Sequence, residues 1–200
     1  MAYKWDVFLS YRRSNYWPKF VQNQFLPKLR TWLDTEVGQT ARIFVDTDQI
    51  RAGDDWPDEL ADALAHSKIM VCLWSAQYFT SRWCALELTQ MLARRESLAG
   101  PNGRLLPLII AVLIHDCENL PRELSRIQQF PMQDYCSPWI AEGSLTEERL
   151  GFEIKRLAQD VADALKHVPT FDESWPSLVT TDFMHLFNAE DSLDLPPSLG

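Results

Sequence analysis

Short apolar runs alternate with longer amphipathic segments along the chain, and this alternation predicts its secondary structure. The apolar runs are short enough to be strands and are rich in β-branched and aromatic residues. They lie at residues 7–9, 43–45, 68–74, 105–113 and 127–130. The central runs are apolar at successive positions, which is typical of parallel strands buried on both faces of a sheet.

Helical spacing of apolar residues marks the segments between these strands. The first helix, predicted over residues 17–36, contains Pro27, which should kink it or split it in two. Further helices are predicted over residues 57–66, from Ser81 to about residue 96, and over residues 146–167. Strands that alternate with helices predict an α/β fold of the flavodoxin-like type, a five-stranded parallel sheet with helices on both faces.

Length and composition are consistent with one folded domain. The chain has 200 residues, of which 46% are hydrophobic, enough for a sizeable core. We expect residues 1–167 to form this domain. Residues 168–200 contain six acidic side chains and neither Lys nor Arg, so we expect an acidic C-terminal extension that is partly ordered or docks on the domain.

The charge and the cysteines exclude several classes of function. The net charge is −9, and the sequence has no basic stripe that could neutralise phosphates, so nucleic-acid binding is not expected. The four cysteines show no C-x-x-C spacing and indicate reduced thiols. The first residues lack the apolar segment of a signal peptide, and no apolar run could span a bilayer. We therefore expect a cytoplasmic protein without membrane contact.

Polar and aromatic residues follow three of the predicted strands. They lie at residues 10–13, 46–55 and 75–87. The carboxyl ends of parallel strands meet at one edge of a sheet, where ligands of such folds bind. The sequence therefore predicts a site at this edge.

The last of these segments contains a tryptophan and a carboxylate at helical spacing. Ser81 is the expected N-cap of the helix that carries Trp83 and Glu87. Residues four apart project from one face of a helix, so a flat ring should lie beside an acid at the edge of a pocket.

Three ordered motifs resemble those of Toll/interleukin-1 receptor (TIR) domains, and the resemblance covers residues 5 to about 165. The motifs are Asp6-Val7-Phe8-Leu9-Ser10-Tyr11-Arg12-Arg13, Phe44-Val45-Asp46 with the loop to Gly53, and Trp83-Cys84-x-x-Glu87. The third is similar to the helix motif of TIR domains that cleave NAD+.

The resemblance implies a role for each matching residue. Glu87 is the expected catalytic carboxylate, and Trp83 the expected wall of the pocket beside it. The remaining expected substrate-binding residues are Phe8, Ser10, Tyr11, Arg12, Arg13, Asp46 and Trp56. The resemblance also implies self-association through TIR–TIR contacts that include the loop at residues 46–56, with sites completed by a neighbouring protomer.

The residue types suit the chemistry of NAD+ cleavage. Nicotinamide leaves NAD+ from an already cationic ring, so no general acid is required, and one carboxylate can face the oxocarbenium-like ribose. An aromatic ring can stack on the cationic nicotinamide, and Arg12 or Arg13 can meet the pyrophosphate. NAD+ is thus expected as the substrate, with no cofactor. The histidines lack metal-ligand spacing, so no metal is expected.

The sequence also resembles stand-alone bacterial TIR enzymes of anti-phage systems such as Thoeris, in which an ADP-ribose-derived product signals to a separate effector. Two other functions stay open. One is a non-catalytic TIR scaffold that acts by homotypic contacts of the loop at residues 46–56. The other, weaker on this evidence, is a secreted effector that mimics host TIR domains.

Structural interpretations also stay open for single residues. Glu87 is alternatively a solvated helix carboxylate, and Trp83 a core side chain. Arg12 and Arg13 are alternatively rim charges or partners of Asp46. Cys84 is expected to be a small buried residue rather than a nucleophile, because no histidine lies near it in sequence.

Overall fold

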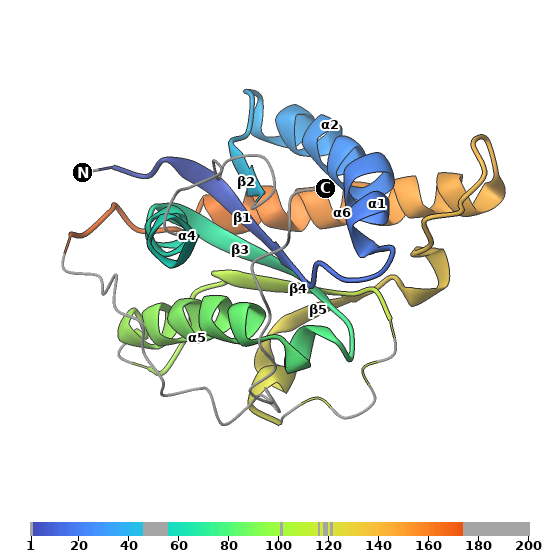
Figure 1. Cartoon of the computed structure of the whole chain (residues 1–200). Coiled ribbons are helices and arrows are strands. Elements are labelled where there is room, and N and C mark those ends of the chain that lie inside the picture. The colour runs from blue at the N-terminus through green and yellow to red at the C-terminus, as the bar shows by residue number, and fades with distance from the viewer. Residues whose placement is uncertain are drawn as a thin grey trace.

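Five parallel strands form the centre of the protein. The computed structural model describes residues 2–45, 56–100, 102–115, 117, 120 and 122–173 (Figure 1). The strands of this part of the chain are β1 (Trp5–Tyr11), β2 (Ile43–Val45), β3 (Ser67–Trp74), β4 (Ile109–Leu113) and β5 (Gln128–Pro131). They pair in the order β2-β1-β3-β4-β5, all parallel. The predicted α/β fold with a five-stranded parallel sheet is confirmed.

Helices cover both faces of this sheet. On one face α2 (Leu26–Val37) packs with α6 (Leu145–Leu165), and on the other α4 (Trp56–Ala65) lies beside α5 (Arg82–Ser97) (Figure 1). Because both faces are covered, the central strands are almost wholly buried. In β1 only the first residue is partly exposed, and in β3 only Lys68. This is the physical reason for their continuous apolar runs.

The first helical segment is divided where Pro27 predicts a break. An α-helical turn, α1 (Trp17–Phe20), is followed by a π-helical stretch, η1 (Val21–Phe25), and then by α2. Pro27 lies in the first turn of α2, where the amide hydrogen that proline lacks is not needed for the helix ladder. The helix ends at Gly38, whose φ of 74° is the left-handed conformation that glycine adopts without a steric penalty.

The fourth strand differs from its prediction. The apolar run predicts residues 105–113, whereas β4 begins only at Ile109. Pro107 cannot donate a ladder hydrogen bond, and the Leu108 N–H turns back to the Leu106 carbonyl at 2.8 Å. The other elements begin and end within a few residues of their predicted bounds.

The chain that follows α6 packs against the amino ends of the strands. The ring of Phe171 stacks on His66, with centroids 5.2 Å apart, and meets the edge of Tyr3. The Tyr3 hydroxyl donates a hydrogen bond to the Pro169 carbonyl at 3.1 Å. Of the predicted extension, residues 174–200 lie outside the described part of the structure.

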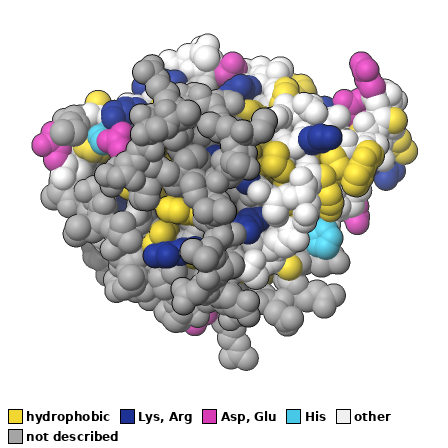
Figure 2. Space-filling view, in the orientation of Figure 1, with side chains coloured by type: hydrophobic (Ala, Val, Ile, Leu, Met, Phe, Trp, Pro, Cys, Tyr) yellow, Lys and Arg dark blue, Asp and Glu magenta, His cyan; other side chains and the backbone are white. Residues whose placement is uncertain are grey.

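Hydrophobic side chains are exposed on the side of the molecule where α6 begins (Figure 2). The large ones among the described residues are Trp139, Leu145 and Phe152, and Trp139 is 78% exposed. None of the described helices is both long and apolar enough to cross a membrane.

Candidate active site

The candidate site lies at the carboxyl edge of the sheet, between the end of β1 and the start of α5. Ser81 caps α5, because its Oγ accepts a hydrogen bond from the Cys84 N–H at 3.4 Å, as predicted. The same Oγ accepts a hydrogen bond from Arg12 Nη1 at 3.0 Å. The polar segments after β1 and β3 are thus joined at the first turn of the helix that carries Glu87.

Glu87 is a buried carboxylate. Its side chain is only 6% exposed, which excludes the alternative of a solvated helix carboxylate. Its Oε2 accepts a hydrogen bond from the Ser10 hydroxyl at 2.5 Å. Ser10 is the penultimate residue of β1, and it is itself buried. The bond therefore connects two of the three predicted motifs directly.

Burial raises the pKa of Glu87 to about 7. A carboxylate in a low-dielectric environment loses hydration, so the protonated form is favoured. The hydrogen bond from Ser10 and the positive charge of Arg13 oppose this effect and lower the pKa. Glu87 is thus held close to half ionisation at neutral pH, a condition found often at catalytic carboxyl groups.

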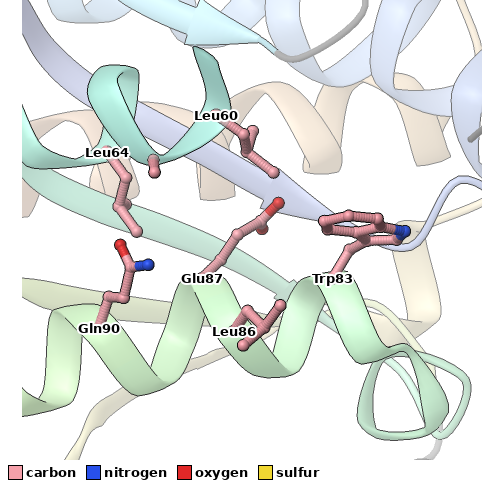
Figure 3. Close-up of a pocket in the computed structure, with 7 residues that line it drawn as sticks. Leu60, Leu64, Trp83, Leu86, Glu87 and Gln90 are labelled. Carbon is pink, nitrogen blue, oxygen red and sulfur yellow. The ribbon is translucent and has the colours of Figure 1, made fainter. Parts of the chain in front are cut away.

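Glu87 and Trp83 face the same pocket between α4 and α5. Leu60, Ala61 and Leu64 line it from α4, and Trp83, Leu86, Glu87 and Gln90 from α5. Figure 3 shows the Glu87 side chain rising from α5 between Trp83 and Gln90 toward α4. Trp83 also packs against the core, so it serves both as core side chain and as pocket wall.

The pocket is small. Its cavity volume among the described residues is about 40 Å³, far less than a dinucleotide requires. Its lining is mainly apolar, with Glu87 and Gln90 as the polar side chains. Within the described residues, therefore, this space suits one ring or one sugar at most.

The remaining predicted site residues lie in different environments. Tyr11 is buried, and Arg12 and Arg13 are partly buried; Arg13 is close enough to Glu87 to lower its pKa. Phe8 differs from the expectation: it is fully buried and stacks on Phe44, with centroids 5.2 Å apart. It lies too deep in the sheet to offer a surface to a ligand and instead supports the strand that carries Ser10.

The other predictions fall on the loop after β2. Asp46 lies outside the described residues, as does the rest of the loop to residue 55. Trp56 begins α4, and its side chain is outside the described part of the structure. Cys84, which follows Trp83, is buried, in agreement with its prediction. Its pKa is raised well above the ordinary value, mainly by burial, so the thiol is neutral.

Two further polar residues belong to the site. Tyr78 places its hydroxyl 2.9 Å from Ser10 Oγ, and Gln90 lines the pocket one helical turn beyond Glu87. Helical spacing from Glu87 could have indicated Gln90. Tyr78 lies within the predicted segment at residues 75–87, but the sequence gives no reason to prefer it over its neighbours.

Within the part of the chain that the structure describes, no group of three or more His, Cys, Asp or Glu side chains could hold a metal ion.

Comparison with known protein families identifies the family of the chain. The model of the TIR domain family matches residues 7–142, and the chain therefore belongs to the TIR domain family. The matched region includes most of β1 and the residues Ser10, Tyr78 and Glu87. No curated protein sequence matches the chain.

Solved structures of low sequence identity are also similar to it. One is the TIR domain of the Toll-related receptor TRR-2 from Hydra magnipapillata, with 20% identity and a TM-score of 0.47, covering 64% of this chain and 85% of that one. Another is the TIR domains of the activated Roq1 resistosome that recognises the effector XopQ. It has 21% identity and a TM-score of 0.42, covering 80% of this chain and 84% of that one.

Proposed function

We propose that this TIR domain cleaves the bond between nicotinamide and ribose in NAD+, with Glu87 as the catalytic carboxylate. The chain belongs to the TIR domain family, and its third motif resembles that of TIR domains that cleave NAD+. The observation that carries the proposal is the placement of Glu87: buried, hydrogen-bonded by Ser10 and facing a pocket that it shares with Trp83. A solvated acid on a scaffold helix has no need for such an environment.

In the proposed reaction Glu87 acts in its ionised form. As the bond to nicotinamide breaks, positive charge develops on the ribose, and a carboxylate in a poorly hydrated pocket stabilises this charge more strongly than in water. The approach of the cationic substrate itself favours ionisation of a group whose pKa is about 7. The leaving nicotinamide carries away the bonding electron pair and becomes neutral.

Trp83 is proposed to position the nicotinamide. An indole face attracts a cationic aromatic ring such as nicotinamide. The indole of Trp83 lies four residues before Glu87 on the same face of the helix and lines the same pocket. Tyr11, Arg12, Arg13, Asp46 and Trp56 stay proposed contacts to the rest of the nucleotide. Either Arg12 or Arg13 is proposed to meet the pyrophosphate.

The small pocket supports a requirement for assembly. The described residues enclose about 40 Å³, which is too little for NAD+, so the proposed reaction requires further residues to complete the site. We propose that the loop at residues 46–56 and a second protomer do so. The exposed apolar residues Trp139, Leu145 and Phe152 provide surface of the kind used in protein contacts.

We further propose a cytoplasmic enzyme of bacterial anti-phage defence, similar to Thoeris TIR proteins, that depletes NAD+ or makes an ADP-ribose-derived signal for a separate effector. This part of the proposal is supported by the sequence resemblance alone. Attack by water yields ADP-ribose, attack by an internal nucleophile yields a cyclic isomer, and an external base yields an exchange product.

The test is nicotinamide release from NAD+ by concentrated purified protein, with the co-product identified by mass. We expect Glu87→Ala to reduce the rate at least about hundredfold. Glu96→Ala is the matched control, because Glu96 is an exposed carboxylate of the same helix. Equal loss of activity in the two variants would contradict a catalytic role for Glu87.

A non-catalytic scaffold is the second candidate, and the small size of the pocket favours it. A scaffold requires its contact surface rather than Glu87. In that case changes at Gly53 or Asp55 abolish function in cells, while Glu87→Ala has no effect.

A further inference from the structure

Tyr78 is held rigidly beside the candidate site. It begins the short 3₁₀ turn η2 (Tyr78–Thr80), which follows β3 after residues 75–77, and it is fully buried. Its backbone N–H lies 3.0 Å from the Ser75 carbonyl and 3.2 Å from the Ser75 hydroxyl. Its ring meets the edge of Phe79, with centroids 5.3 Å apart. The phenol oxygen therefore has little freedom to leave its position 2.9 Å from Ser10 Oγ.

Counting hydrogens fixes the direction of the hydrogen bonds around Ser10. A serine hydroxyl carries one hydrogen and can accept through its lone pairs. When Glu87 is ionised it can only accept, so Ser10 donates its single hydrogen to Glu87. The hydrogen between Tyr78 and Ser10 must then come from Tyr78, and the Cys72 thiol, the other hydrogen-bond partner of the Tyr78 side chain, can donate its own hydrogen to the phenol oxygen. The result is a directed chain from the Tyr78 hydroxyl through Ser10 to the Glu87 carboxylate.

We propose that Tyr78 is a positioning residue that acts through Ser10 to stabilise and orient the ionised carboxylate of Glu87. A hydroxyl that accepts a hydrogen bond becomes a stronger donor, so the Tyr78 hydroxyl strengthens the bond that Ser10 makes to Glu87. It also prevents the Ser10 hydroxyl from rotating away. The catalytic meaning of this chain rests on the proposed function, whereas its effect on Glu87 does not require turnover.

The groups that face Glu87 leave few other sources of stabilisation. Arg13, after β1, contributes a positive charge. The thiols of Cys72 on β3 and Cys84 on α5 interact electrostatically with Glu87, but burial raises the pKa of both, so they are neutral. Burial likewise keeps the Tyr78 phenol neutral. The residues of α4 that line the pocket, Leu60, Ala61 and Leu64, are apolar. Loss of the Tyr78 hydroxyl should therefore reach Glu87 mainly through Ser10.

Titration of Glu87 in the full-length protein tests the proposal. Carboxyl carbons of glutamate are labelled with ¹³C, and the signal that disappears in Glu87→Gln is followed against pH. Ser10→Ala should raise the pKa of Glu87, because it removes the direct hydrogen bond. Tyr78→Phe should raise it less, lowering the acid dissociation constant roughly threefold. In the double variant the effect should equal that of Ser10→Ala alone.

The double variant separates the hydrogen-bond chain from a merely structural role. If Tyr78 only supports packing, its substitution disturbs Glu87 equally with or without the Ser10 hydroxyl, and the two shifts add. Additive shifts, or an unchanged Glu87 in Tyr78→Phe, overturn the proposal. Tyr3→Phe is the matched control, because Tyr3 donates to Pro169 at the opposite edge of the sheet; it should leave the Glu87 titration unchanged.

A second variant covers the case in which Tyr78→Phe does not fold. Site-specific 3-fluorotyrosine at position 78 keeps the ring and makes the phenol a stronger donor, so the pKa of Glu87 should fall. An unchanged or higher pKa overturns the proposal.

The titrations and the turnover assay separate this proposal from the proposed function. If the pKa of Glu87 responds as described but the protein does not cleave NAD+, the positioning role stands and the proposed enzymatic function fails. If NAD+ is cleaved but the pKa of Glu87 does not change in the Tyr78 variants, the proposed enzymatic function stands and the positioning role fails.

Discussion

The Glu87 carboxylate accepts a hydrogen bond from the Ser10 hydroxyl at 2.5 Å, and this bond joins the middle of one motif to the end of another. Glu87 is otherwise surrounded by apolar and neutral groups, apart from the charge of Arg13. A carboxyl group in this environment is costly to ionise. That cost has measurable consequences for the stability of the protein as well as for the proposed reaction.

Glu87→Gln should stabilise the protein at high pH. The pKa of Glu87 is about 7 when folded, above its ordinary value of 4.5, so the unfolded chain loses this proton at lower pH than the folded one. Ionising Glu87 therefore weakens folding as pH rises from about 4.5 through 7. At pH 8 we expect the variant to exceed the wild type by up to about 3 kcal/mol in free energy of unfolding.

Urea unfolding at several pH values measures this difference. The advantage of Glu87→Gln should shrink as the pH is lowered toward 5, because the wild-type carboxyl group is then protonated in the folded state. A difference that is independent of pH would show that Glu87 has no raised pKa.

Trp83 should affect substrate binding. Trp83→Ala removes the proposed stacking surface, and we expect kcat/KM for NAD+ to fall about tenfold or more. Trp83→Phe keeps an aromatic ring and should retain most of the wild-type kcat/KM. Steady-state kinetics measures both. Trp32→Ala, which removes a partly buried indole on α2, is the control and should leave kcat/KM unchanged. If Trp83→Ala behaves like the control, Trp83 is a core side chain only.

Ser81 should contribute to both stability and activity. Its Oγ caps α5 and also accepts from Arg12, so Ser81→Ala should cost about 1 kcal/mol of stability and loosen the contact between β1 and α5. Ser144 caps α6 in the same way, by accepting from the Glu147 N–H at 3.2 Å. Unfolding and kinetics of the two alanine variants are compared. We expect similar losses of stability, with reduced kcat/KM in Ser81→Ala alone; equal kcat/KM in the two would disprove the role of Ser81 at the site.

Most of the fold could be predicted from the sequence, because its strands are continuous apolar runs and the segments between them have the apolar spacing of helices. The error in β4 arises where hydropathy and backbone chemistry disagree: residues 105–108 are apolar, but Pro107 cannot join a ladder. Pro27 was informative because proline also lacks the N–H that a regular helix uses. It marked a break in the helix, although the π-helical form of that break depends on packing.

The site could be predicted only in part. Motif and spacing identified Ser10, Trp83 and Glu87, but the bond between Ser10 and Glu87 joins residues 77 positions apart and depends on their rotamers. The contact of Tyr78 with Ser10 could not be predicted for the same reason. Phe8 was misassigned because its motif neighbours face the carboxyl edge of the sheet, whereas Phe8 itself lies two residues deeper in the strand than Ser10, against Phe44.

The most direct test of the account compares two titrations of the same protein. One is the pH dependence of kcat/KM for nicotinamide release, which reports ionisation of the free enzyme. The other is the ¹³C titration of Glu87. We predict that activity rises with pH, that both midpoints lie near 7, and that both move upward together in Ser10→Ala. A rate that stays constant while Glu87 titrates would contradict the claim that ionised Glu87 performs the reaction.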